Sequence, residues 1–134
     1  MPNGHHGPKE EWDRLEAPLV ELDPVIRAFA ENHKMKFSSN DHAWPERSLT
    51  IVDELHRKIQ IYLKNEEPLT FIVGAYAWRD SESDRCLKME FVTEPVSPPA
   101  LRINLLSWLE QSYKTVMAWK TEDLEFATKL QKLS

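Results

Sequence analysis

The stretch "HRKIQIYLKNEEPLTFIVGAYAWR", residues 56–79, decides the fold. Its first part alternates, with Ile59, Ile61 and Leu63 on one side of the chain and mostly polar residues between them. Such a period of two is typical of a β-strand that buries one face. The segment "NEEP" that follows is polar and short enough for a hairpin, so this strand and the next are predicted to be antiparallel neighbours.

The second strand of this hairpin, residues 69–79, is apolar on both faces. One face carries Leu69, Phe71, Val73, Ala75 and Ala77, and the other carries Ile72, Gly74, Tyr76 and Trp78. A strand that is apolar on both sides is either buried on both sides or in contact with another molecule. Gly74 in its middle indicates a bend or the close approach of another group.

Three further segments, residues 35–38, 48–53 and 85–94, extend the sheet because they alternate and are joined by short polar separators. They predict a four- to five-stranded antiparallel meander, in which residues 35–38 form the additional edge strand. In the last strand we expect Met89 and Phe91 to face a layer of helices, because they belong to its most apolar side.

Helical patterns flank the sheet in the sequence. The apolar residues from Trp12 to Leu22 recur at helical spacing, and Pro18 is expected to kink or split that run. A second helix is expected to open at Asp23–Pro24, with the aspartate as N-cap and the proline at the first helical position. Ser97 is the predicted N-cap of a long amphipathic helix that follows the sheet.

A short final helix is predicted from Thr121 to about Leu130, because acidic residues occupy its first turn. The expected fold class is α+β: N-terminal helices, a four- to five-stranded meander, a long amphipathic helix and a short final helix in a two-layer sandwich. Residues 1–8 are expected to be a disordered leader, and residues 9–134 to form a single domain.

The composition excludes several classes of function. The 134-residue chain has a formal net charge of −5, three glycines and one cysteine, Cys86. One cysteine forms neither an internal disulfide nor a cysteine-rich zinc site, and so few glycines do not build a phosphate-binding loop. Residues 1–12 lack the apolar stretch that a secretory signal requires, and no run of about 18 apolar residues occurs in the sequence. We therefore expect a cytoplasmic protein with no membrane segment, no cofactor and no metal.

The predicted binding surface is the face of the hairpin that a single layer of helices leaves uncovered. Its residues are Tyr62, Ile72, Tyr76 and Trp78, within a rim of charged and polar side chains. Aromatic residues in a polar rim are the usual composition of an interface core. The sequence therefore favours an interaction module of unknown specificity, which binds a protein partner or a second copy of itself as a homodimer.

Two alternatives concern the same surface. The N-terminal helix can cross behind the sheet and cover it, which would leave no binding surface there. Otherwise the protein can bind a small ligand, or act as an enzyme without short motifs, in a pocket between the sheet and the C-terminal helix. The residues expected to line that pocket are Tyr62, Tyr76, Trp78 and Trp108.

The acidic composition argues against nucleic acid as a partner, because phosphate binding requires clustered positive charge. Such binding would require the scattered basic residues to gather on the sheet beside the aromatic residues. These basic residues are Lys58, Lys64, Arg79 and Lys88.

The loop "NDHAWPERS", residues 40–48, is a separate candidate. Asp41 and His42 are residue types that carry out acid–base chemistry, and Arg47 can bind an anionic substrate with two parallel hydrogen bonds. The structural alternative is a turn that ends in a Glu46–Arg47 pair on the surface. Because neighbours in sequence seldom converge on one point, the turn is favoured and an enzyme is not the leading hypothesis.

Overall fold

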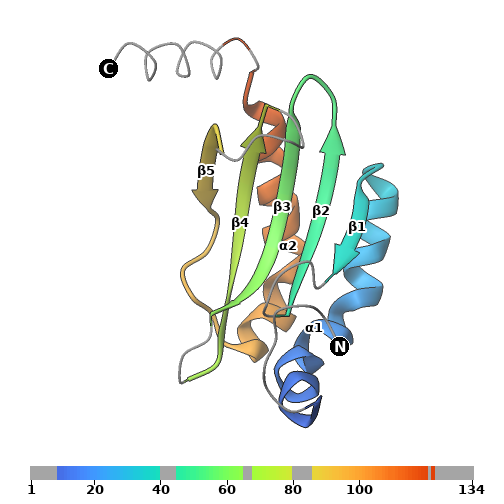
Figure 1. Ribbon diagram of the computed structural model, residues 1–134, viewed down its shortest axis with the longest axis vertical. Helices are drawn as coiled ribbons and strands as arrows, with labels where there is room; N and C mark the ends of the chain where they lie inside the picture. Colours follow the sequence, from blue (N-terminus) through green and yellow to red (C-terminus); the bar gives the residue numbers. More distant parts are fainter. Residues whose placement is uncertain (1–8, 40–44, 65–67, 80–85, 121, 123–134) are drawn as a thin grey trace.

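The computed structural model describes residues 9–39, 45–64, 68–79, 86–120 and 122. One antiparallel sheet has the strand order of the sequence, and the two helices precede and follow it (Figure 1). The elements are α1 (Lys9–Asn32), β1 (Lys36–Ser39), β2 (Glu46–Val52), β3 (His56–Lys64), β4 (Thr70–Trp78), β5 (Lys88–Phe91) and α2 (Pro98–Ala118). The predicted α+β class and five-stranded meander are confirmed. The predicted leader and, except for Glu122, the predicted final helix lie outside the described residues.

Both helices lie on the same side of the sheet, behind the strands in the view of Figure 1. α2 packs along β3 and β4, whereas α1 packs along β1 and β2. The side toward the helices, here the helix face, consists of the odd-numbered residues of β1 to β4 and the even-numbered residues of β5. The opposite side, here the open face, consists of the even-numbered residues of β1 to β4 and the odd-numbered residues of β5. The N-terminal helix therefore does not cross the open face, and that alternative is wrong.

The core lies between the helix face and the two helices. Ile59, Ile61, Phe71 and Val73 from the sheet are nearly inaccessible to solvent. They pack with the buried apolar stripes of α1 and α2 in one cluster. The helix residues in this cluster include Leu19, Leu22, Ile26, Leu101, Leu105 and Leu109. The apolar residues that recur at every second position in the strands and about every 3.6 positions in the helices thus pack together in one core.

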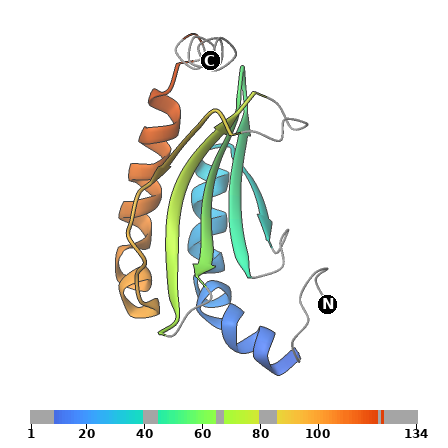
Figure 2. The ribbon, with the colours of Figure 1, turned by 60° about the vertical axis from the view of Figure 1, so that its left-hand side comes forward.

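α1 is one bent helix and not two separate helices. Pro18 and Pro24 both lie inside it, and Figure 2 shows that its axis changes direction between the dark blue and light blue parts. A proline inside a helix removes one backbone hydrogen bond and clashes with the preceding turn, which bends the helix. The predicted kink is confirmed, but the predicted split is wrong. Asp23 is accordingly not an N-cap, and its carboxylate instead binds Arg47 on β2.

The two ends of α2 are capped by side chains. The Oγ of Ser97 accepts a hydrogen bond from the amide of Ala100 at 3.3 Å, as an N-cap residue does. At the other end, the buried guanidinium of Arg57 donates to the carbonyls of Val116 and Trp119. A cation is favourable there because helix carbonyls carry partial negative charge. Arg57 thereby ties the end of α2 to the middle of the sheet.

Candidate functional site

The open face is organised in rows that cross the strands. One row runs from β1 to β5 through Lys36, Thr50, Lys58, Tyr76 and Met89. The neighbouring row runs through Ser38, Ser48, Gln60, Gly74 and Phe91. In both rows the β1–β3 part is polar, and the β4–β5 part is aromatic or apolar apart from Gly74. The face therefore has a hydrophilic half and a hydrophobic half.

Gly74 is required by its own strand. A Cβ atom at this position would lie 2.6 Å from the Oη of Tyr76 and 3.0 Å from two of its ring carbons. The phenol end of the Tyr76 ring thus lies over the glycine, and Tyr76 is buried although it belongs to the open face. Burial, with a further contribution from the charge and hydrogen bond of Tyr62, raises the pKa of the Tyr76 phenol well above its ordinary value. The group expected to approach Gly74 closely is therefore Tyr76.

Trp78 continues this aromatic arrangement at the end of β4. Its ring stacks on that of Tyr76, with 5.8 Å between centroids and 25° between the planes. The ammonium of Lys58 lies 5.3 Å from the Trp78 ring centroid, which is a cation–π contact. Trp78 and Tyr62 are partly exposed, whereas Ile72 is buried. Of the four predicted binding residues, Trp78 and Tyr62 keep the larger accessible fraction.

β5 adds two residues that the sequence assigned to the wrong face. Met89 pairs with Tyr76 and Phe91 pairs with Gly74, so both side chains belong to the open face. They are 55% and 52% exposed. The expectation that they face the helices fails because α2 lies along β3 and β4 and all of β5 remains exposed. The alternating charges of Lys88 and Glu90 at an edge position are the sequence signal that could have indicated this.

The hydrophilic half of the open face contains a hollow of about 390 Å³. Its lining residues are Lys36, Ser38, Thr50, Val52, His56 and Lys58. Two ammonium groups, an imidazole and two hydroxyls line it, and no carboxylate is among the lining side chains. Such a set of donors can bind an anion.

Arg47 serves the packing of α1 on the sheet. It is 3% exposed, and its Nε and Nη2 donate to the two carboxylate oxygens of Asp23 at 2.7 and 3.1 Å. Its Nη2 also lies 3.0 Å from a carboxylate oxygen of Glu16. Burial lowers the pKa of Arg47, but the hydrogen bond and charge of Asp23, with those of Glu16, outweigh it and hold the pKa above its ordinary value.

The expected Glu46–Arg47 surface pair is wrong. Successive strand residues point to opposite faces, so Arg47 lies on the helix face and Glu46 on the open face. Both are buried. The Glu46 carboxylate accepts hydrogen bonds from Ser48 and Gln60 at 2.7 and 2.8 Å. The other two catalytic candidates, Asp41 and His42, lie outside the described residues.

The pocket expected between sheet and C-terminal helix does not bring its four residues together. Trp108 lies on α2 and packs against the core on the helix side. Tyr62, Tyr76 and Trp78 occupy open-face positions of β3 and β4. Because a sheet separates its two faces, these three rings and Trp108 cannot line one cavity.

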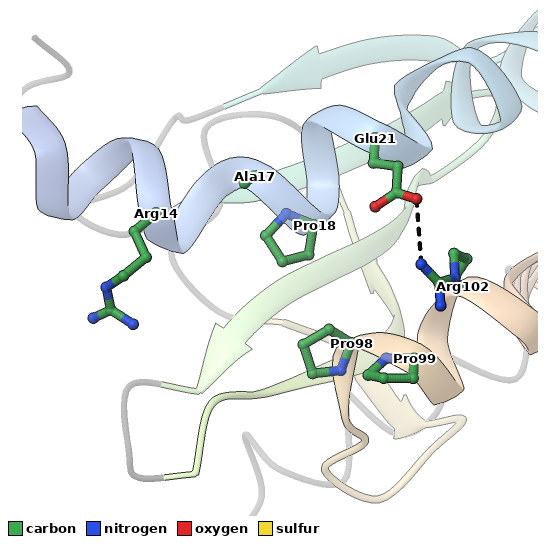
Figure 3. A pocket seen from close by; sticks show the side chains of 7 residues that line it. All are labelled: Arg14, Ala17, Pro18, Glu21, Pro98, Pro99 and Arg102. Atoms are coloured by element: carbon green, nitrogen blue, oxygen red, sulfur yellow. Dashed lines mark hydrogen bonds and ion pairs between the residues drawn. The ribbon is translucent and has the colours of Figure 1, made fainter.

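A shallow hollow does lie between the helices, and Figure 3 shows its walls. It has a volume of about 250 Å³. The lining residues are Arg14, Ala17, Pro18, Glu21, Pro98, Pro99 and Arg102. One ion pair crosses it, from Arg102 to Glu21 at 3.5 Å, and both side chains are 59% exposed. Such an exposed pair contributes little to stability.

The basic residues considered for nucleic-acid binding do not all lie on the open face. Lys58 and Lys64 belong to the open face, but Lys88 lies on the helix face with its ammonium 5.5 Å from the Trp119 ring centroid. In the described part of the chain, no three His, Cys, Asp or Glu side chains form a group that could hold a metal ion. Among the same residues, no helix has the length and apolar character needed to cross a membrane.

Comparison of the chain with protein-family models, with curated proteins and with solved structures finds no match. The site is therefore defined by its geometry: an open sheet face with an apolar half formed by Tyr62, Tyr76, Trp78, Met89 and Phe91, and a cationic hollow beside it.

Proposed function

We propose that this protein is an interaction module that acts by association through the open face of its sheet, and that its first partner is a second copy of the chain. The observation that carries the proposal is the exposure of Met89 and Phe91 beside the partly exposed Trp78. Large apolar side chains gathered on one face and bordered by Lys58 and Gln60 have the composition of an interface core.

The test is the solution mass, measured by light scattering after size exclusion at two protein concentrations. The variant is Phe91→Glu, which places a charge in the apolar half of the face. The matched control is Ile103→Glu, because Ile103 is 78% exposed on the outer side of α2. We expect the parent chain and Ile103→Glu to dimerise, and Phe91→Glu to remain monomeric, because a desolvated charge in an interface core is costly.

Two outcomes contradict the proposal. A parent chain that stays monomeric at every concentration would remove the homodimer. A dimer that Ile103→Glu dissociates and Phe91→Glu leaves intact would place the interface on the helices.

A second candidate function, binding of a small anionic ligand, is favoured by one observation, the hollow that Lys36, His56 and Lys58 help to line. Its volume of about 390 Å³ lies within the range of small-molecule sites. Titration calorimetry with inorganic pyrophosphate tests it. We expect binding that Lys58→Ala weakens at least tenfold and that Lys114→Ala, an exposed lysine on α2, leaves unchanged. Equal heats from the parent chain and Lys58→Ala would exclude the site.

A further inference from the structure

β5 (Lys88–Phe91) forms the border of the sheet, and no described element lies beyond it in Figure 1. All four of its residues are exposed. The opposite border, β1, has α1 packed along it. An open edge presents unpaired backbone groups to which another strand can bind. β5 is therefore the place where this sheet can be extended.

The hydrogen bonds between β5 and β4 define which backbone groups are free. The amide of Val92, directly after β5, donates to the carbonyl of Val73 at 2.8 Å. Hydrogen-bonded pairs alternate with non-hydrogen-bonded pairs in an antiparallel ladder, so Glu90 also directs its backbone groups toward β4. The amides and carbonyls of Met89 and Phe91 consequently point away from β4, along the open edge.

Of the registers centred on Met89 and on Glu90, only the first makes the charged side chains of β5 complementary. If two copies pair with their two-fold axis at Met89, Lys88 of each copy lies opposite Glu90 of the other. If the axis lies at Glu90 instead, two carboxylates lie directly opposite each other. Opposite charges on facing strands stabilise a pair and like charges destabilise it. The charges of Lys88 and Glu90 therefore select the register centred on Met89.

We infer that two copies of this chain join through antiparallel pairing of β5 centred on Met89, so that their open faces continue across one sheet. The amide and carbonyl of Met89 then form hydrogen bonds with the carbonyl and amide of Met89 in the second copy. The inference rests on the proposed homodimer and locates its interface at the β5 edge, where Met89 and Phe91 lie, so that Trp78 on β4 lies outside that interface. A strand of four residues buries less than a standard interface, so the dimer dissociates on dilution in the micromolar range.

Charge reversal tests the register. Lys88→Glu and Glu90→Lys each place like charges opposite one another, and each is expected to raise the dimer dissociation constant about tenfold or more. The double variant restores opposite charges and is expected to return to within about threefold of the parent chain. Lys88→Glu also removes an ammonium from the Trp119 ring, so thermal unfolding is measured in parallel to confirm that each variant folds.

Cysteine cross-linking locates the axis, in a Cys86→Ser background that removes the native thiol. On the axis, the Met89 positions of two copies have a Cα–Cα separation of about 5.5 Å, within reach of a disulfide. We expect oxidised Met89→Cys to give a covalent dimer on a non-reducing gel. Glu90→Cys is the matched control because its thiols lie apart in this register. Preferential cross-linking of Glu90→Cys would overturn the inference.

The test also separates failure of this inference from failure of the proposed function. Trp78→Glu is expected to leave the edge-paired dimer intact, because Trp78 lies on β4 away from the edge. A dimer that dissociates with Trp78→Glu, but ignores both charge reversals and does not cross-link at position 89, would pack face to face. That outcome refutes edge pairing and keeps the homodimer. A chain that is monomeric at all concentrations refutes both.

Discussion

The two faces of the sheet differ in how completely their side chains are buried. On the helix face, Ile59, Phe71 and Val73 are nearly inaccessible and pack in a single core. On the open face, the buried ring of Tyr76, whose phenol end lies over Gly74, is next to the exposed side chains of Met89 and Phe91. The helix face therefore determines stability, because burial of apolar area drives folding. The exposed residues of the open face, Met89 and Phe91, can change with little loss of stability because they bury little area within the monomer. The following predictions test this difference.

The largest expected effect comes from comparing two phenylalanines, one on each face. Phe71 is fully buried and Phe91 is 52% exposed. Phe71→Ala is expected to lower the free energy of unfolding by about 3–5 kcal/mol, because it removes transfer energy and leaves a cavity. Phe91→Ala is expected to cost about 1 kcal/mol or less. Urea unfolding of the two variants, at protein concentrations low enough for the chain to be monomeric, measures both free energies of unfolding. Equal decreases would contradict the difference between the two faces.

A second comparison uses two arginines that bind acidic residues of α1. Arg47 is buried with Asp23 and Glu16, whereas Arg102 forms an exposed pair with Glu21. Arg47→Met is expected to cost about 3 kcal/mol, because it leaves carboxylates without their buried cation. Arg102→Met is expected to cost less than about 0.5 kcal/mol. Chemical denaturation distinguishes them, and a mild effect of Arg47→Met would mean that the carboxylates are well hydrated without it.

The third prediction concerns alkaline pH and the open face. The pKa of Tyr76 is higher in the folded state than in the unfolded state, where it is about 10. Its contribution to stability is therefore fully present below about pH 10 and is lost as pH rises from there toward the folded-state pKa. The expected slope is up to about 1.4 kcal/mol per pH unit.

Tyr76→Phe tests this assignment because it keeps the ring and removes the ionising group. We expect its stability to fall less steeply with pH above about 10 than that of the parent chain. Gly74→Ala should also reduce the slope, because the added Cβ atom displaces the Tyr76 ring. Denaturation midpoints at pH 9, 10 and 11 provide the measurement. An unchanged slope in Tyr76→Phe would assign the alkaline loss to other groups.

The smallest expected effect concerns Ser48, a buried polar residue of the open face. The hydroxyl of Ser48 donates to the carboxylate of Glu46 at 2.7 Å. Ser48→Ala is expected to lower the unfolding free energy by about 1 kcal/mol, since it removes one donor from a buried carboxylate. Ser38→Ala in the same row, on the edge strand, is expected to change it by less than about 0.5 kcal/mol. Thermal unfolding of both variants would detect a reversal of this order.

The sequence by itself determined the element order, the α+β class and the antiparallel meander. These features depend on local periodicity, short polar separators and capping residues, all of which act between residues close in the chain. The start of α2 at Ser97–Pro98 and the bounds of β3 were predicted for this reason. Of the candidate site, the sequence predicted that Tyr62, Ile72, Tyr76 and Trp78 share the second face of the sheet, and of these the structure leaves Tyr62 and Trp78 partly exposed.

Tertiary structure alone decided the face of β5 and the roles of Asp23 and Arg47. The apolar pattern shows that the two sides of a strand differ, but it does not show where the helices lie. Because α2 lies over β3 and β4, Met89 and Phe91 of β5 remain exposed. Likewise, Asp23 and Arg47 lie 24 residues apart in sequence, and only the packing of a bent α1 on β2 brings their charges together. Long-range packing and charge pairing have no local signature, because they depend on the distance between elements in space.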